Sequence, residues 1–358
     1  MVRFISRRLM LLIPVLVGIL LVTFVIVRLI PGDPCVVMLG ERATPDKCEA
    51  FKARYGLNDN IIVQFGRYLG NMVQGNWGDS IRFSRPVVDI VAERLPMTIE
   101  LTICAMLFSS IVGVTLGVIS AVRRNSFVDT LTMLGANVGV SMPVFWLGLM
   151  LAYLFAIILK GTPLFIPPSG RFSAGASLTP LAQVWGIQNP VGFQKFILDF
   201  LSNLVFVNAI FTGNWGIFWD ELRHLILPAL AVGTIPLAII ARMTRSSMLD
   251  VLGQDYVRAE RAKGLKQRAV IVRHAMRNAL IPIVTIIGIE TGSLLSGAVL
   301  TETVFGLPGV GTMLVSSILG RDYPIVQGFT LVIALIYVIV NLIVDTSYAY
   351  LDPRIRLQ

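Results

Sequence analysis

The densest group of reactive or ligand-binding side chains lies at residues 255–264, which read Asp-Tyr-Val-Arg-Ala-Glu-Arg-Ala-Lys-Gly. They belong to a longer basic segment, 242–279, that carries nine Lys and Arg residues. Asp255 can cap or begin a helix and Gly264 can end it, so the pattern predicts a short helix closed at both ends. Charges beside small residues suit close contact with another protein and contain no nucleophile–base pair.

Enzyme chemistry is not indicated elsewhere in the chain. The two histidines, His224 and His274, lack a Ser, Cys or carboxylate partner at a catalytic spacing, and the three cysteines show no zinc-like or redox spacing. No GxxxxGK[ST] loop is present, so the chain itself is not expected to bind ATP phosphates. The Gly-rich run 306–311 predicts a re-entrant or turn element. We therefore expect no catalytic residue, no metal site and no enzyme activity.

One carboxylate, Glu290, lies midway along an apolar run. An ionisable group in such a run is costly and is a functional candidate by default. We hypothesise that Glu290 faces a translocation cavity and attracts a cationic amino group. The alternative is a hydrogen bond to a Ser or Thr of a neighbouring helix. Ser293 and Ser296 fit either close helix packing or the lining of that cavity, and both alternatives stay open.

These residues are carried by membrane helices. The chain of 358 residues is 55% hydrophobic and 14% charged, against about 25% charged in soluble domains, and its mean hydropathy is +0.77. Its net charge of +9 is interleaved with apolar runs, which favours a membrane protein over a nucleic-acid binder. The predicted fold is an all-α integral membrane protein with six transmembrane helices and a large extracytoplasmic loop region. The six runs of spanning length are 9–30, 98–122, 131–159, 225–241, 280–304 and 326–350.

Basic residues gather at the N-terminus, at 123–124, in 242–279 and in the C-terminal tail. The positive-inside rule therefore predicts that both termini and the 242–279 segment are cytoplasmic. Apolar residues at helical spacing over 193–204 predict an amphipathic helix lying on the outer surface. The fourth apolar run is short and contains Pro228 and Pro236, so its helix either begins earlier or is kinked.

Two cysteines, Cys35 and Cys48, share the first outer loop and could form a disulfide in an oxidising compartment. Two free thiols are equally compatible, because sequence alone does not place the Cα atoms within about 7 Å. The predicted division of the chain is an N-terminal helix 1–30, an outer cap 31–97, a five-helix core 98–350 with an outer insertion 160–224 and a cytoplasmic loop 242–279, and a tail 351–358.

The segment DYVRAERAKGL, followed by HAMRNALIP, resembles the cytoplasmic signature of the permeases of ABC importers, in the dipeptide/oligopeptide branch. Arg258, Ala259 and Glu260 stand where that signature has Glu-Ala-Ala, and Gly264 is retained. The resemblance covers nearly the whole chain, and 162–220 is least like the family. It also rests on RFISRRLMLLIPVLVGILLVTFVIVRLIPGDP, RMTRSSMLDVLGQDY, TETVFGLPGVGTML, RDYPIVQG and DPRIR.

The resemblance implies a type I ABC importer permease fold and the import of di- or oligopeptides. The implied partners are a second, homologous permease, two cytoplasmic ATPases that hold ATP and Mg, an extracytoplasmic substrate-binding protein and the lipid bilayer. No cofactor in this chain and no nucleic acid are expected. Alternatives are a nickel-chelate or glutathione permease of the same fold, or a self-contained secondary transporter. The residues expected to couple to the ATPase are Asp255, Tyr256, Arg258, Ala259, Glu260, Ala262, Lys263, Gly264 and Leu265.

Overall fold

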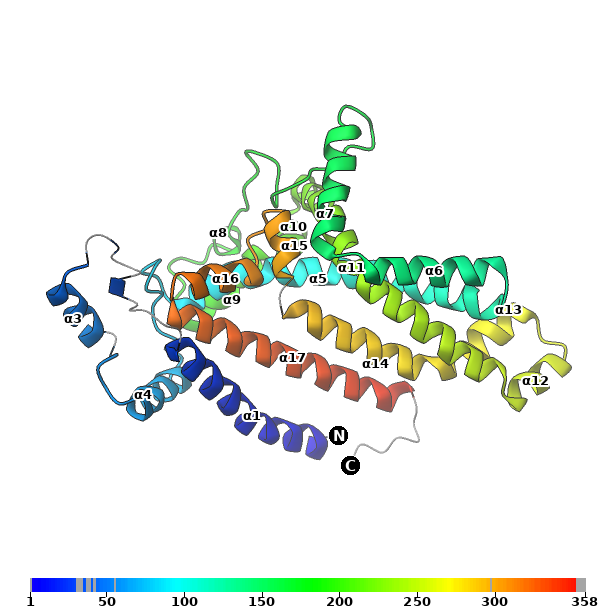
Figure 1. Cartoon of the computed structure of the whole chain (residues 1–358), viewed down its shortest axis with the longest axis horizontal. Coiled ribbons are helices and arrows are strands. Elements are labelled where there is room, and N and C mark those ends of the chain that lie inside the picture. Colours follow the sequence, from blue (N-terminus) through cyan, green and yellow to red (C-terminus); the bar gives the residue numbers. More distant parts are fainter. Residues whose placement is uncertain are drawn as a thin grey trace.

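The computed structural model describes residues 2–29, 35–36, 40, 43–54, 56–296 and 298–351, and the regular elements in these ranges are helices. The molecule is elongated, with α3 (Pro45–Arg54) at one end and α12 (Asp255–Ala262) at the other (Figure 1). Five helices are long and apolar enough to cross a membrane, which confirms the prediction of an all-α membrane protein. They belong to α1 (Val2–Leu29), α5 (Val87–Val122), α11 (Trp215–Leu252), α14 (Met276–Leu295) and α17 (Tyr323–Leu351).

The third predicted span, 131–159, is not one straight helix. α6 (Phe127–Ser141) is bent by 102° relative to α7 (Val144–Tyr153) and the π-helical η2 (Leu154–Ile158) that continues it. Pro143 explains the break, because proline disfavours helical backbone in the residue before it, and Met142 is extended at φ −79° and ψ 129°. α7 consequently projects away from the other long helices (Figure 1).

Two other predicted spans have the wrong boundaries. α5 begins at Val87 rather than at residue 98, and α11 covers 38 residues rather than the short run 225–241. Pro228 and Pro236 both lie inside α11, so they do not end it. At 1.5 Å per residue each helix is over ~50 Å long, whereas the hydrocarbon layer is about 30 Å thick. α5 and α11 therefore extend well beyond the membrane core.

The fifth predicted span, 280–304, ends early. α14 stops at Leu295, and the chain then forms the short helices α15 (Val299–Val304) and α16 (Val310–Leu319). α16 is apolar but has only 10 residues, too few to cross a membrane. The turn between the two, 305–309, contains the first four residues of the Gly-rich run 306–311, and the last two begin α16, in agreement with the predicted re-entrant or turn element.

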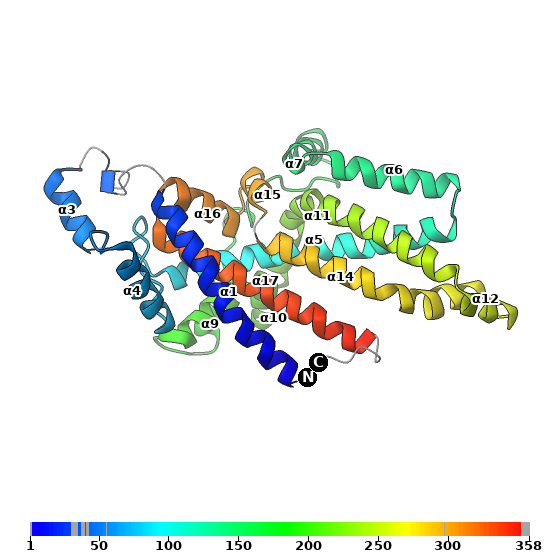
Figure 2. The same cartoon turned by 60° about the horizontal axis from the view of Figure 1, so that its bottom comes forward.

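Glycines let α5 and α11 lie side by side along much of their length (Figure 2). A Cβ on Gly117 would lie 2.6 Å from the carbonyl oxygen of Ala241, and one on Gly113 would lie 2.9 Å from that of Leu237. Ser109 completes the contact by donating a 2.7 Å hydrogen bond to the Gly233 carbonyl. Small residues at this interface, which we call the seam between α5 and α11, let the two backbones come closer than larger side chains would allow.

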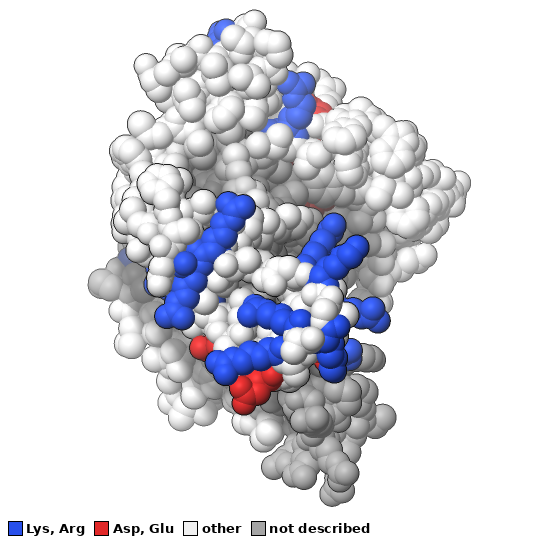
Figure 3. Space-filling view, turned by 90° about the vertical axis from the view of Figure 1, so that its right-hand side faces the viewer, with Lys and Arg blue, Asp and Glu red and all other residues white. Residues whose placement is uncertain are grey.

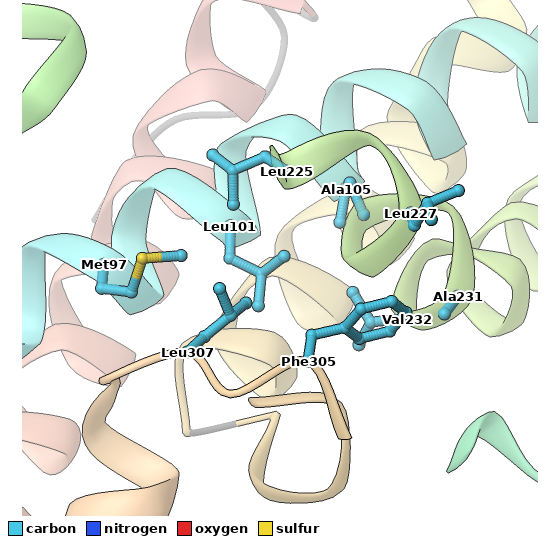
Figure 4. Close-up of a cluster of buried hydrophobic side chains, with 10 residues drawn as sticks. Met97, Leu101, Ala105, Leu225, Leu227, Ala231, Val232, Phe305 and Leu307 are labelled. Carbon is cyan, nitrogen blue, oxygen red and sulfur yellow. The ribbon is translucent and has the colours of Figure 1, made fainter. Parts of the chain in front are cut away.

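A buried apolar cluster fills the space beside this seam (Figure 4). The turn after α15 contributes Phe305 and Leu307, which point between α5 and α11 and are both 1% exposed. The turn is thereby fixed to the two longest helices. The buried members of the cluster are Met97, Leu101, Ala105, Leu225, Leu227, Ala229, Ala231, Val232, Phe305 and Leu307.

The first outer loop is tied down at two places. Cys35 and Cys48 form a disulfide, with their Cα atoms 5.4 Å apart. Asp322, just before α17, is fully buried and its carboxylate accepts hydrogen bonds from the Ser80 hydroxyl at 2.5 Å and the Ile81 amide at 3.2 Å. The loop 76–86 is therefore attached to the start of α17. α4 (Ile61–Val73) lies between these two attachment points in sequence.

The predicted helix at 193–204 is present as α9 (Gly192–Asn203), but its surroundings differ from the prediction. Phe196 and Phe200 pack against buried residues of α5, α16 and α17, so part of the apolar face is covered by protein. Ser202, expected on the polar face, is buried because its hydroxyl accepts a hydrogen bond from the Leu181 amide of α8 (Leu181–Val184). α9 is bent by 91° from α10 (Val205–Thr212).

The predicted tail 351–358 lies outside the described residues except for Leu351.

The seam between α5 and α11 gives a stability prediction. Gly117→Ala should lower the apparent thermal unfolding midpoint of the detergent-purified protein, because overpacking costs about 1–3 kcal/mol and the new methyl meets backbone. Gly135→Ala in α6 is the matched control, since its Cβ would meet nothing within 4 Å. A midpoint for Gly117→Ala equal to that of Gly135→Ala would contradict the packing argument.

Candidate functional site

α12 is fixed to the rest of the molecule by one apolar side chain and one hydrogen bond. Val257 is fully buried against residues of α11 and the chain that returns to α14, Met248, Val251 and Val270 among them. The Tyr256 hydroxyl accepts a 2.5 Å hydrogen bond from the Asn278 side-chain amide. α12 is thus a packed element of the molecule and does not hang on a free loop. Val257 was not among the predicted site residues, although apolar residues at helical spacing precede it.

The two ends of α12 follow from its sequence. Asp255 lies in the first turn, where its negative charge interacts favourably with the positive end of the helix dipole. The N-cap residue is Gln254, whose side chain makes no capping hydrogen bond. Gly264 follows the last residues of the helix at φ +81°, a left-handed backbone that suits glycine. The chain continues through α13 (Gln267–Ala269) and the π-helical η3 (Val270–Ala275) into α14.

The remaining predicted coupling residues face outward. Arg258 lies 3.4 Å from Asp255, and this pair is open to water; Lys263, also exposed, lies 3.1 Å from Glu260. Ala259 and Ala262 are exposed between these charges, so the helix presents a surface of small and charged side chains. Tyr256 and Glu260 differ from the rest because they are half-buried.

A basic surface surrounds α12 at this end of the molecule (Figure 3). We call it the basic end, and define it by its exposed cationic side chains. Acidic residues are few on this face, so an approaching protein with acidic groups would be attracted. The basic end consists of Arg258, Arg261, Lys263, Lys266, Arg268, Arg273 and Arg277.

An ion pair joins α5, α6 and α11 near the end of the molecule that carries α12. Arg245 of α11 donates two hydrogen bonds to the Asp129 carboxylate of α6, at 2.7 and 2.8 Å. The same carboxylate accepts hydrogen bonds from the Ser120 hydroxyl of α5 and, at 2.9 Å, from the Asn125 amide. Two-point arginine–carboxylate pairing is among the strongest and most directional contacts in proteins. No sequence pattern singled out Asp129.

A second charged cluster lies at the opposite end of α5 and α11. Arg171 from the outer segment donates to Glu100 of α5 at 2.5 Å and to Glu221 of α11 at 2.8 Å. All three side chains are nearly inaccessible to water, and Arg171 also bonds the Asn203 carbonyl at 2.6 Å. Glu100 accepts a further bond from the Phe206 amide at 2.9 Å. The cluster holds the outer segment against the two longest helices.

Another buried carboxylate organises the turn between α15 and α16. Glu302 of α15 accepts hydrogen bonds from the Thr98 hydroxyl at 2.8 Å and from the Thr312 amide at the start of α16 at 2.9 Å. A Cβ on Gly309 would lie 2.3 Å from this carboxylate, and one on Gly311 would lie 3.0 Å from it. The run TETVFGLPGVGT therefore needs glycine at 309 and 311, because a side chain at either position would collide with the Glu302 carboxylate. The helix dipole of α16 further favours a carboxylate there.

The predicted cavity residues lie on α14 but do not share one hollow. Glu290 is half-buried and makes no hydrogen bond or ion pair with another described residue. Ser293 is exposed on the same helix face, three residues on. Ser296 instead lines a cavity of about 750 Å³ between α1 and α17, together with Asn341 and Asp345. The chain thus offers Glu290 no Ser or Thr partner among the described residues, and its cavity role stays a hypothesis.

Comparison with known proteins covers the whole chain. The model of the family described as binding-protein-dependent transport system inner membrane component matches residues 113–357, and the model of the N-terminal part of such membrane components matches residues 1–102. A dipeptide transport system permease protein of Alkalihalophilus pseudofirmus is 45% identical over 356 residues, which cover 99% of this chain and 100% of that protein.

Two further relatives are similar over the same extent. A dipeptide transport system permease protein of Escherichia coli K12 is 43% identical over 357 residues, with 99% of each chain covered. An oligopeptide transport system permease protein of Bacillus subtilis 168 is 36% identical over 357 residues, covering 99% of this chain and 100% of that protein.

The Asp129–Arg245 pair yields a prediction with a control on the same helix. Arg245→Gln should lower the free energy of unfolding by about 2 kcal/mol, because it removes charge-assisted hydrogen bonds from a buried carboxylate. Arg242→Gln removes the same charge but only an exposed bond to the neutral Asn137, and should have little effect. Thermal unfolding of both variants in one detergent measures the difference, and equal midpoints would refute the assignment.

Proposed function

The chain belongs to the family of binding-protein-dependent transport system inner membrane components, and we propose that it imports di- or oligopeptides as a membrane-spanning subunit of an ATP-driven transporter. The observation that carries this conclusion is identity of 43–45% over the full length to permeases named for dipeptides. The chain is a transport subunit rather than an enzyme, and ATP hydrolysis belongs to separate subunits. Relatives named for peptides favour this substrate class over the nickel-chelate and glutathione alternatives.

The family depends on a substrate-binding protein and on partner ATPases, and in bacteria its members lie in the inner membrane. We infer further that this chain pairs with a second, homologous permease and that two ATPases, which hold ATP and Mg, lie beneath the pair. We also infer that both termini and the basic end face the cytoplasm. The concentration of Lys and Arg around α12 supports that orientation.

We propose that α12 is the element that docks into an ATPase subunit. It is short, packed against α11 through Val257 and exposed on its other side. Ala259 and Ala262 permit close approach, and the surrounding basic end attracts acidic groups of a partner. Because Val257 and the Tyr256–Asn278 bond fix α12 to the helices behind it, a displacement of α12 would be passed to α11 and α14.

Two residues make this docking helix differ from the general signature. Arg258 stands where that signature has Glu, and Glu260 stands where it has Ala. Arg258 is fully available for a partner, since its pair with Asp255 is long and exposed. Glu260 is partly buried and paired with Lys263, so it shapes the helix surface more than it offers a free charge. We therefore expect the partner ATPase to carry an acidic group opposite Arg258.

The docking proposal is tested at Gly264. Gly264→Glu places a bulky anion beside α12 at a backbone of φ +81°, and nothing within 4 Å in this chain would obstruct it. The assembled transporter should lose ATPase binding, or hydrolyse ATP without peptide uptake, while the permease still inserts. Peptide uptake and ATP hydrolysis are measured on the same reconstituted complex.

Gly175→Glu is the matched control. Gly175 has φ +89° and open space around its Cβ, but it lies in the outer segment, so it bears the same backbone strain far from α12. Uptake and ATP hydrolysis should stay coupled in this variant. Normal coupling in Gly264→Glu would sink the docking proposal, and uptake that needs no ATPase would sink the proposed function in favour of a secondary transporter.

The hypothesis for Glu290 predicts a substrate-dependent effect. Glu290→Gln should raise the KM for peptides with a free amino terminus about fivefold, the equivalent of roughly 1 kcal/mol, because a cationic group loses its anionic partner. Uptake of N-acetylated peptides should be unchanged, and Ser293→Ala serves as a control on the same face. Equal KM values for both peptide classes in wild type and variant would end the hypothesis.

A further inference from the structure

A cavity of about 150 Å³ lies at the end of the spanning helices that is farthest from α12. Its walls come from the last turn of α1, from α4, from the loop 76–81 and from the first turns of α17. Its lining residues include ones with cationic, amide and phenol groups beside apolar ones. None of the residues discussed for docking or transport lines it.

Arg28 is the charged group at the inner wall of this cavity. Its guanidinium lies 3.4 Å from the centre of the Phe24 ring and 5.7 Å from that of Tyr323, so aromatic faces hold it in place. Its Nε donates a 2.9 Å hydrogen bond to the Gln64 side chain, whose own amide donates to the Asp59 carbonyl at 2.8 Å. Among the described residues no carboxylate pairs with Arg28.

Two residues that line the cavity carry buried polar atoms without hydrogen-bond partners. Gln327 is only 4% exposed, and its Nε2 makes no hydrogen bond. The Tyr68 hydroxyl is also shielded from water and makes none. A buried donor without an acceptor costs free energy, so each such group in a native structure calls for an unseen partner. The missing partner must supply acceptors, because an amide Nε2 can only donate.

The charge of the lining agrees with that requirement. Among the described residues, two arginines and no Asp or Glu line the cavity, and one of the two, Arg67, is already paired with Asp59 at 2.8 Å. Arg28 therefore leaves an unbalanced positive charge beside the free donors of Gln327 and Tyr68. The volume corresponds to roughly five water molecules at about 30 Å³ each, which is room for a tetrahedral anion.

We propose that this cavity binds a phosphate group, held by Arg28, Tyr68 and Gln327, and that a phospholipid supplies it. Arg28 is in the last turn of α1 and Gln327 is near the start of α17, both of which are of membrane-spanning length. The cavity thus lies at the depth where spanning helices leave the hydrocarbon, which is the depth of lipid phosphates. An acceptor-only, anionic group satisfies all three side chains at once.

The test compares lipids that differ only in the phosphate. The purified full-length chain in detergent is incubated with phosphatidylglycerol or with diacylglycerol of the same acyl chains, and retained lipid is counted by native mass spectrometry. Wild type should retain the phospholipid in about tenfold preference, since charge-assisted hydrogen bonds distinguish the two ligands. Arg28→Gln should abolish the preference, and Tyr68→Phe and Gln327→Leu should each reduce it several-fold.

Arg85→Gln is the control, because it removes an outer-end arginine that pairs with Glu93 and does not line the cavity. Tyr68→Phe keeps the test decisive if Arg28→Gln fails to fold. Arg28-dependent thermal stabilisation by inorganic phosphate, with no lipid retained, would support the phosphate site with free phosphate as its occupant. Equal retention of the two lipids with no effect of phosphate, or an unchanged preference in Arg28→Gln, would overturn the proposal and assign the cavity to water.

Discussion

The close approach of α5 and α11 is the constraint on which the rest of this molecule depends. Gly113 and Gly117 of α5 and Gly233 of α11 bring the two backbones within a distance that a single methyl group would prevent. In a membrane, where apolar surface gains little by leaving lipid, such close packing and a few internal hydrogen bonds must hold helices together. The turn that carries Phe305 and Leu307 is shaped to fill the remaining space. The positions of α14, α15 and α16 follow from that filling.

Charged side chains then secure both ends of the pair. Arg245 and Asp129 join α11 to α6 at one end, and Arg171 joins α5 and α11 to the outer segment at the other. Removing one partner of such a buried pair leaves an uncompensated charge, which is the costly event. These ion pairs therefore disfavour arrangements of the helices in which a buried charge would be left without its partner. Glu302 has the same part in the re-entrant element, where it joins Thr98 of α5 to the start of α16.

Sequence patterns predicted the all-α architecture and the presence of the short helix α12 well, because both depend on local signals. Spanning length, hydropathy and the glycine after Lys263 are visible in a single stretch of chain. The bend at Pro143 was missed, whereas the early start of α11 was one of the two alternatives left open, since proline is tolerated within one helix and breaks another according to its tertiary surroundings. The sequence does not single out Arg171 or Asp129, because the residues that they pair with lie far away along the chain. Val257 could not be singled out either, because its role is to pack into a buried apolar cluster. Glu290 shows the same limit, since a lone carboxylate in an apolar run does not reveal which way it faces.

The continuity of α11 has a mechanical consequence. This helix runs unbroken from Trp215 to Leu252. Ion pairs hold it near both ends, through Glu221 and through Arg245. Between them, the Gly233 carbonyl accepts a hydrogen bond from Ser109 of α5. A stiff rod held at an intermediate fulcrum moves its two ends in opposite directions. A tilt that draws the α12 end inward would therefore swing the end near Arg171 outward. Opening on one side of the membrane and closing on the other would then be two aspects of a single rotation, and no separate signal between the two gates would be required.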